Sequence, residues 1–233
     1  DLRYRDMLLR AWLKRFATGA SVARPSARDL PAPQSPLPLE ACCLGWIAAK
    51  NKGPWERQVV GFLGSESAML RETAAWFCGE YKLASALGSL VEMGATEPQV
   101  AFSRALAIKH LNHERGVTLL REFYRTADLE SLLLQIGFGF AGPLDMFMCA
   151  EADVLLERLV GVMEKADMRS IAQSGAASLI LNRLTGYYDG YTAVLGLDPQ
   201  ALQAMGRRWR IWLGKHGKEL VWNNQKKRFE TRE

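Results

Sequence analysis

Two histidines stand close enough in the sequence to share a metal ion. His110 and His113 are three residues apart, a spacing that places both side chains on one face of a helix. Zinc takes three or four protein ligands, and no glutamate or cysteine stands at a helical spacing that would complete the set. His216 lies far along the chain in a basic segment. The pattern therefore predicts a histidine pair at a helix end and no bound metal.

Four cysteines could offer thiol chemistry. Cys42 and Cys43 are adjacent, whereas Cys78 and Cys149 lie on other predicted helices. This spacing is typical neither of a disulfide framework nor of a zinc site. Three of the four have mostly apolar neighbours, among which a free cysteine behaves as a small hydrophobic residue. We expect the thiols to pack in the core and to bind no cofactor.

Carboxylates gather between residues 151 and 167, where only Arg158 and Lys165 offset them. Two carboxylates in one cleft could act as a general acid and a general base. Nothing in the sequence places two of them in a cleft, so a solvated helix face is favoured. The glycine-rich stretch 137–142 follows no predicted strand and does not fit a phosphate-binding loop. The sequence predicts no catalytic residue among the cluster Glu151, Asp153, Glu157, Glu164 and Asp167.

Tryptophans are the remaining candidates for a functional role. Four of them occupy apolar positions of predicted helices and are expected in the core: Trp46, Trp76, Trp209 and Trp212. The other three lie in or beside charged segments, where a tryptophan buried at an interface contributes strongly to binding. With the apolar residues around the first tryptophan, the predicted partner-binding residues are Leu8, Trp12, Leu13, Phe16, Trp55 and Trp222.

A basic amphipathic helix over 2–17, within an N-terminal segment 1–23, contains Leu8, Trp12, Leu13 and Phe16. Five prolines in the following segment 24–38 favour an extended connector. An apolar stripe tethered in this way needs cover, so we expect the helix to pack on another protein. The alternative is that it folds back and caps the first helical pair.

From residue 39 on, proline and cap signals divide the chain into short helices. Pro54, Pro143 and Pro199 suit the first turn of a helix, and Thr96 to Gln99 fits a capping box. The expected helices span 39–51, 54–63, 66–81, 83–93, 97–112, 114–125, 128–141, 143–149, 152–165, 168–185 and 199–215.

A repeat of thirty residues connects several of these helices. The large residues Trp46, Trp76, Leu106 and Ile136 recur at this interval, and the residue before each is small in the first three cases, at Gly45, Ala75 and Ala105. A large apolar residue beside a small one lets the next helical pair approach closely. We therefore expect stacked helical pairs, with the four large residues buried on equivalent inner positions.

Two stretches resemble bacterial HEAT-repeat proteins of the PBS-lyase HEAT-like type. Met69 to Gly79 is similar to the helix that carries valine-arginine and alanine-alanine pairs, and Leu184-Thr185-Gly186 followed by Arg208-Trp209 and Trp212 is similar to their closing segment. The resemblance covers about residues 39–224 and implies an all-α, right-handed α-solenoid over 39–216. The alternating residues after Gly217 favour a short extended basic arm over 217–233, which we expect to dock on the last helix through Leu220, Trp222 and Phe229. It departs from the pattern at Ala101, where Arg71 would recur.

Two functional hypotheses follow from the resemblance. The first is a non-catalytic protein-interaction scaffold or structural subunit of a larger assembly, which binds protein partners through the repeat surface and the terminal arms. The second is a nucleic-acid-binding protein such as a DNA glycosylase-type enzyme, in which tryptophans and an aspartate would line a basic groove. HEAT-like bilin lyases are a third and weaker analogy, because no specific residue of this chain matches them.

The charge distribution favours the first hypothesis. Residues 1–28 carry seven basic and two acidic side chains, residues 29–206 fourteen and twenty, and residues 207–233 nine and three. A nucleic-acid groove in the repeats would need the opposite balance. No apolar run is long enough to span a membrane, and the resemblance implies a soluble bacterial protein, cytoplasmic or periplasmic.

Overall fold

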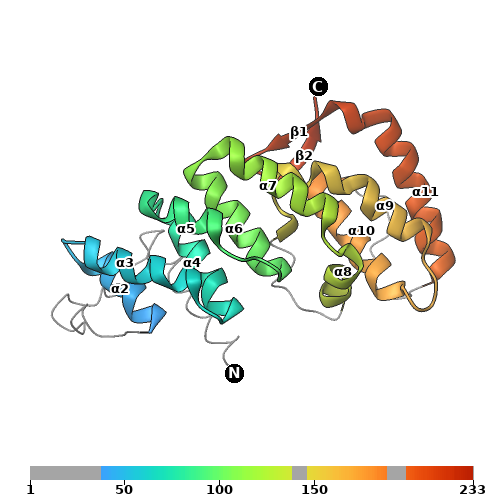
Figure 1. The fold of residues 1–233 in the computed structure, drawn as a ribbon. Helices are drawn as coiled ribbons and strands as arrows, with labels where there is room; N and C mark the ends of the chain where they lie inside the picture. Colours follow the sequence, from blue (N-terminus) through green and yellow to red (C-terminus); the bar gives the residue numbers. More distant parts are fainter. Residues whose placement is uncertain (1–37, 138–145, 188–197, 233) are drawn as a thin grey trace. The chain divides into compact units, whose positions relative to one another are not determined.

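The computed structural model describes residues 38–137, 146–187 and 198–232 (Figure 1). These residues are mostly helical, and their β structure is limited to one two-stranded hairpin, which confirms the all-α class. The predicted helix 2–17, with Leu8, Trp12, Leu13 and Phe16, lies outside the described residues, as does nearly all of the proline-rich segment.

The chain divides into two compact units, with the boundary between Leu120 and Arg121. The boundary falls inside the helix formed by residues 113–126, within the range 39–216 that the sequence predicts as one repeat domain. Among the described residues, none of the helices combines the length and the hydrophobicity that crossing a membrane requires.

The first unit consists of short helices that follow one another closely along the chain. The elements are α2 (Leu39–Ala48), α3 (Gly53–Gly61), the 3₁₀ helix η1 (Phe62–Gly64), α4 (Ala68–Glu80), the 3₁₀ helix η2 (Ala84–Ala86), α5 (Leu87–Glu92), α6 (Pro98–Leu111) and α7 (His113–Thr126), which continues into the second unit. Helix α4 packs along α6, and α2 packs against α3.

The second unit combines helices with the C-terminal hairpin. Its elements are α8 (Leu129–Gly137), the 3₁₀ helix η4 (Ala150–Leu155), α9 (Leu156–Glu164), α10 (Ile171–Thr185), α11 (Pro199–His216), the 3₁₀ helix η5 (Gly217–Glu219), β1 (Leu220–Asn223) and β2 (Arg228–Thr231). Helix α10 packs against α8 and α9, and α11 packs along α9. The predicted helix 143–149 lies partly outside the described residues, and its described end is a 3₁₀ turn and a bend.

Most of the predicted helix starts are confirmed, because they depend on local chemistry. Pro54 and Pro199 stand in the first turns of α3 and α11, and the Asp198 carboxylate accepts a hydrogen bond from the backbone N–H of Gln200 at 3.0 Å. The capping box predicted at Thr96 does not form. Its hydroxyl donates to the Glu97 carboxylate at 3.1 Å, and no side chain caps α6.

The large residues of the thirty-residue repeat are less buried than predicted. Of the four, only Ile136 is buried, at 8% exposure, whereas Trp46, Trp76 and Leu106 are half-buried. The small residues before them are the buried ones, namely Gly45, Ala75 and Ala105. The helices meet through their small residues, and the large rings lie along the flank of the contact, where Trp46 meets Phe77 edge-on at 5.6 Å.

Gly45 shows this arrangement directly. A Cβ atom at this position would overlap the indole ring of Trp55, which is buried at 6% exposure. The ring of Trp55 therefore packs inside the first unit and leaves little surface for a partner to contact.

Three arginines donate hydrogen bonds from one helix to backbone carbonyl oxygens at the end of an earlier segment. Arg104 of α6 donates to the carbonyl oxygens of Leu90 and Val91 at 2.8 and 2.6 Å, beside the end of α5. Arg158 of α9 donates to the carbonyl oxygens of Tyr124 and, at 3.0 Å, of Ala127 at the end of α7. Such contacts satisfy carbonyls that a helix end leaves without partners. Arg71 of α4 has the same kind of role, described below.

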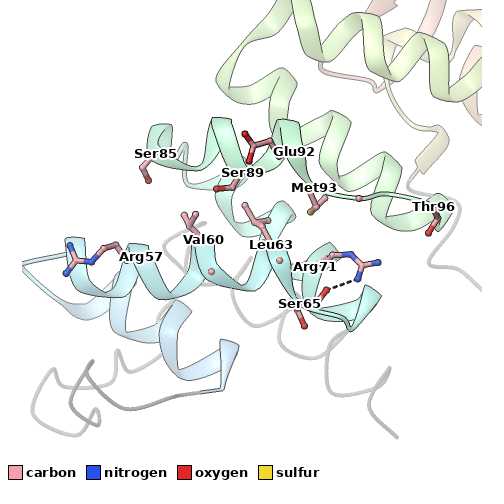
Figure 2. A pocket seen from close by; sticks show the side chains of 13 residues that line it. Arg57, Val60, Leu63, Ser65, Arg71, Ser85, Ser89, Glu92, Met93 and Thr96 are labelled. Carbon is pink, nitrogen blue, oxygen red and sulfur yellow. Dashed lines mark hydrogen bonds between the residues drawn. The ribbon is translucent and has the colours of Figure 1, made fainter.

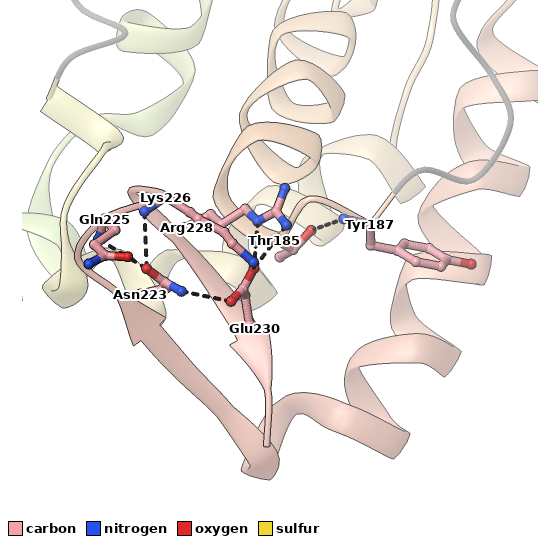
Figure 3. A network of polar contacts seen from close by, with 7 residues as sticks. All are labelled: Thr185, Tyr187, Asn223, Gln225, Lys226, Arg228 and Glu230. Atoms are coloured by element: carbon pink, nitrogen blue, oxygen red, sulfur yellow. Dashed lines mark hydrogen bonds and ion pairs between the residues drawn. The ribbon is translucent and has the colours of Figure 1, made fainter. Parts of the chain in front are cut away.

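The C-terminal arm forms an antiparallel hairpin (Figure 3). Trp222 of β1 pairs with Phe229 of β2. The two rings meet edge to face at 5.0 Å, and Phe229 is buried. Strand β2 packs on α10, whereas the sequence predicted docking on the last helix. Gly186, which ends α10 at φ +62°, has no Cβ and so leaves room for the Arg228 guanidinium.

Glu230 organises the hairpin electrostatically (Figure 3). Its carboxylate accepts hydrogen bonds from Lys226 at 2.8 Å, from two nitrogens of Arg228 at 2.8 and 3.0 Å, and from Asn223 at 2.8 Å. These donors, Lys226 above all, lower the pKa of Glu230 from 4.5 to about 2.

We expect the hairpin to loosen in acid. Because the pKa of Glu230 is lowered in the folded chain, its contribution is complete above pH 4.5 and is lost as the pH falls toward 2. The nuclear Overhauser contacts between Trp222 and Phe229 should weaken over this window. A Glu230→Gln variant should show weaker contacts at neutral pH and no further loss in the window. Unchanged ring contacts at pH 2 in the unmodified chain would contradict the prediction.

A candidate binding groove in the first unit

A groove of about 930 Å³ lies in the first unit (Figure 2). One side comes from α3 and η1, and the other comes from η2, α5 and the segment that follows α5. Figure 2 shows the labelled side chains from both sides around the same space. The lining residues are Arg57, Val60, Gly61, Leu63, Gly64, Ser65, Arg71, Ser85, Ser89, Glu92, Met93, Gly94 and Thr96.

The lining combines apolar side chains with exposed backbone. Val60, Leu63 and Met93 supply apolar surface, and the last two are buried against the core of the unit. Three of the lining residues are exposed glycines with no atom near the position of a Cβ, namely Gly61, Gly64 and Gly94. A bound chain could approach the backbone closely at these glycines.

The polar groups of the lining are hydroxyls and ions of both signs. Arg57 is exposed and makes no ion pair with any described residue, whereas the Ser85 hydroxyl is held by the Glu56 carboxylate. Glu92 is the one carboxylate among the lining residues, and these include no histidine or cysteine. The groove therefore offers hydrogen bonds and apolar contacts, without the imidazole or thiol that commonly serves nucleophilic catalysis.

Arg71 fixes one end of the groove in place. Its guanidinium donates to the carbonyl oxygens of Ser65 and Glu66 at 2.7 and 2.9 Å, and it forms an ion pair with Glu97 at 2.9 Å. The pKa of Glu97 is lowered, first by its own backbone N–H and then by Arg71. One side chain thus joins the turn after η1 to the start of α6.

The cysteines lie away from the groove lining and are packed as the sequence predicted. Cys42, Cys43 and Cys78 are buried, and Cys149 is half-buried. Burial raises the pKa of Cys42 to about 11 and that of Cys78 to about 12. These thiols therefore stay protonated at neutral pH and are poor nucleophiles.

The two neighbouring histidines stand at the junction of α6 and α7. His110 is in the last turn of α6, His113 begins α7, and both are exposed. Within the described ranges, no group of three or more histidine, cysteine or acidic side chains is arranged to hold a metal ion.

Most of the carboxylates between 151 and 167 have specific partners. Asp153 forms an ion pair with Arg121 at 2.8 Å, and burial outweighs this pairing so that the pKa of Asp153 is raised. Asp167 accepts a hydrogen bond from the Ser170 hydroxyl at 2.7 Å. Glu157 and Glu164 both bind Arg210 of α11. Glu151 is buried, so the predicted solvated helix face does not include all five carboxylates.

Of the predicted partner-binding residues, the structure describes Trp55 and Trp222, and only Trp222 is not buried. It is half-buried in the hairpin, where its indole N–H donates to the Asn224 side chain at 3.1 Å. Sequence reasoning missed the groove in the first unit, because three separate segments contribute its lining. The nearest local signal was the pair Gly61 and Gly64 beside Val60 and Leu63.

No family model, no curated protein and no solved structure matches this chain. Its function is therefore inferred from the groove and from the exposed surfaces.

Proposed function

We propose that the chain is a non-catalytic protein-interaction module, serving as a scaffold or structural subunit of a larger assembly. The observation that carries this proposal is the groove of the first unit, whose apolar lining, open glycine backbone and hydroxyl groups suit a segment of another protein. Burying one aliphatic side chain there would contribute about 1.5 to 3 kcal/mol.

We further propose that the helices are HEAT-like pairs in a right-handed solenoid. Helices two places apart pack on each other, as stacked pairs require: α4 on α6 in the first unit, and α8 on α10 and α9 on α11 in the second. The hydrogen bonds of Arg71, Arg104 and Arg158 to backbone carbonyl oxygens support the same proposal, since each connects a helix to the end of an earlier segment.

The chemistry of the groove defines the segment that it would bind. Val60, Leu63 and Met93 suit apolar side chains, and the exposed guanidinium of Arg57 suits a carboxylate. We therefore expect a segment of a partner protein that has apolar residues and an acidic residue near one end.

Filling the groove should abolish partner binding without unfolding the chain. In Gly61→Phe, the new side chain starts from a position with no atom within 4 Å and occupies space at the groove. A photo-crosslinking amino acid at Ser89, which also lines the groove, should capture one reproducible partner from cells of the source organism, and Gly61→Phe should remove that product.

The matched control is Gly88→Phe. Gly88 is exposed on α5 with equally open space around it, but it does not line the groove. This variant should retain the cross-linked product. If both variants yield the same products as the unmodified chain, or if position 89 captures no protein, the groove is not the binding site.

A further inference from the structure

Helix α11 of the second unit has two faces of different chemistry. The inner face packs its apolar residues into the unit, with Leu202, Trp209 and Leu213 buried. The outer face contains Arg207, Ile211 and Lys215, which follow one another at intervals of four residues and are all exposed. Exposed Lys218 follows in η5.

The cations of the outer face differ in how far acidic residues of the chain pair with them. The pKa of Glu164 is lowered first by hydrogen bonds from Arg210, and Arg207 lies close enough to help lower it without forming an ion pair. Arg210 differs from its neighbours, since it forms ion pairs with Glu157 and Glu164 of α9, and the hydrogen bonds that it donates to Glu164 raise its pKa. Arg207 and Lys215, in contrast, make no ion pair with any residue that the structure describes. The outer face therefore presents cations that are available to an acidic partner.

An exposed aliphatic side chain stands in the middle of these cations. Ile211 is 61% exposed, with Arg207 one turn before it and Lys215 one turn after it. An aliphatic residue ringed by charge matches the usual composition of a protein interface, with an apolar centre and a polar rim.

A stack of aromatic rings holds the same helix in place. Tyr187, which follows α10, stacks on Trp212 at 4.8 Å and 17°, and Trp212 meets Trp209 at 5.4 Å and His216 at 5.3 Å. A surface on a helix held in this way is already ordered, so a partner would not have to order it on binding.

We propose that the outer face of α11, formed by Arg207, Ile211, Gly214 and Lys215, binds an acidic amphipathic helix of a partner protein. The cations meet carboxylates, and Ile211 meets the apolar stripe of the partner helix. A phosphate backbone would use the cations alone and would leave Ile211 exposed to the solvent, so the composition favours protein over nucleic acid. This surface belongs to the second unit, and the inference does not depend on the groove of the first.

Gly214 allows a test in which stability and binding change in opposite directions. It lies one turn from Ile211, and a Cβ there would meet no atom within 4 Å. Gly214→Glu should raise the Tm by about 1 to 3 °C, because glycine is a poor helix former. The same variant should weaken binding of a fluorescent helical peptide of glutamate and leucine about tenfold, because it adds a like charge.

Gly214→Lys is the matched control, with a similar gain in Tm and no loss of peptide binding. Ile211→Ser should weaken peptide binding about fivefold, whereas Met168→Ser, at another exposed apolar residue of the same unit with 74% exposure, should not change it. Peptide binding that Gly214→Glu and Ile211→Ser leave unchanged would overturn the proposal. It would also be overturned by tighter retention of a DNA duplex than of the peptide, with steep salt dependence and no effect of Ile211→Ser.

Discussion

Replacing Trp209 by alanine is expected to lower the free energy of unfolding by about 3 to 5 kcal/mol, because the change leaves a large cavity. Trp209 has no exposed surface, and it contacts Tyr187 edge-on at 5.0 Å as well as Trp212. Chemical denaturation monitored by circular dichroism would measure the loss as a lower transition midpoint.

Two further variants separate packing from other effects of this change. Trp209→Phe should cost much less, since the buried indole N–H of Trp209 has no hydrogen-bond partner among the residues that the structure describes. Ile211→Ala lies two residues away on the exposed side of the same helix and should change stability by less than about 0.5 kcal/mol. Equal losses for Trp209→Ala and Ile211→Ala would show that the ring does not carry the packing of α11.

The second large effect concerns the contact between α4 and α6. Gly79→Ala is expected to lower the free energy of unfolding by about 1 to 3 kcal/mol. A Cβ at Gly79 would lie 2.6 Å from the Cα and 3.0 Å from the Cβ of Ala107, so backbone would have to move. The direction of the change in stability is informative, because a glycine-to-alanine substitution at an uncrowded helix position stabilises a protein by about 0.5 to 1 kcal/mol.

Gly161→Ala in α9 provides that comparison, since a Cβ there would meet no atom within 4 Å. Thermal unfolding of the two variants should therefore move in opposite directions from the unmodified chain. A stabilising effect of Gly79→Ala would mean that α4 and α6 are not in close contact.

Local chemistry explains which elements could be predicted from the sequence. Helix starts at Pro54 and Pro199 depend only on the neighbouring residues, and so does the cap at Asp198. The capping box at Thr96 does not form, because α6 begins one residue later, with Glu97 at the N-cap. The Thr96 hydroxyl donates to the Glu97 carboxylate, which also binds Arg71 from a different helix.

Contacts between distant segments explain what could not be predicted. Periodicity placed Trp46 and Trp76 on an inner face, but the depth of burial depends on which small residues of other helices they meet. Trp55 was expected at an interface from its charged neighbours, and only its contact with Gly45 reveals that it is buried. The groove has the same origin, because its lining comes from segments that fold together.

The arginine contacts at Arg104 and Arg158 determine which parts of the chain should resist acid. Each joins a guanidinium to backbone carbonyl oxygens, and neither group changes its protonation state in the acid range. The hairpin depends instead on the carboxylate of Glu230. Acidification should therefore unfold the C-terminal hairpin first. The helix ends that Arg104 and Arg158 hold should stay folded and provide a starting framework for refolding when the pH is restored.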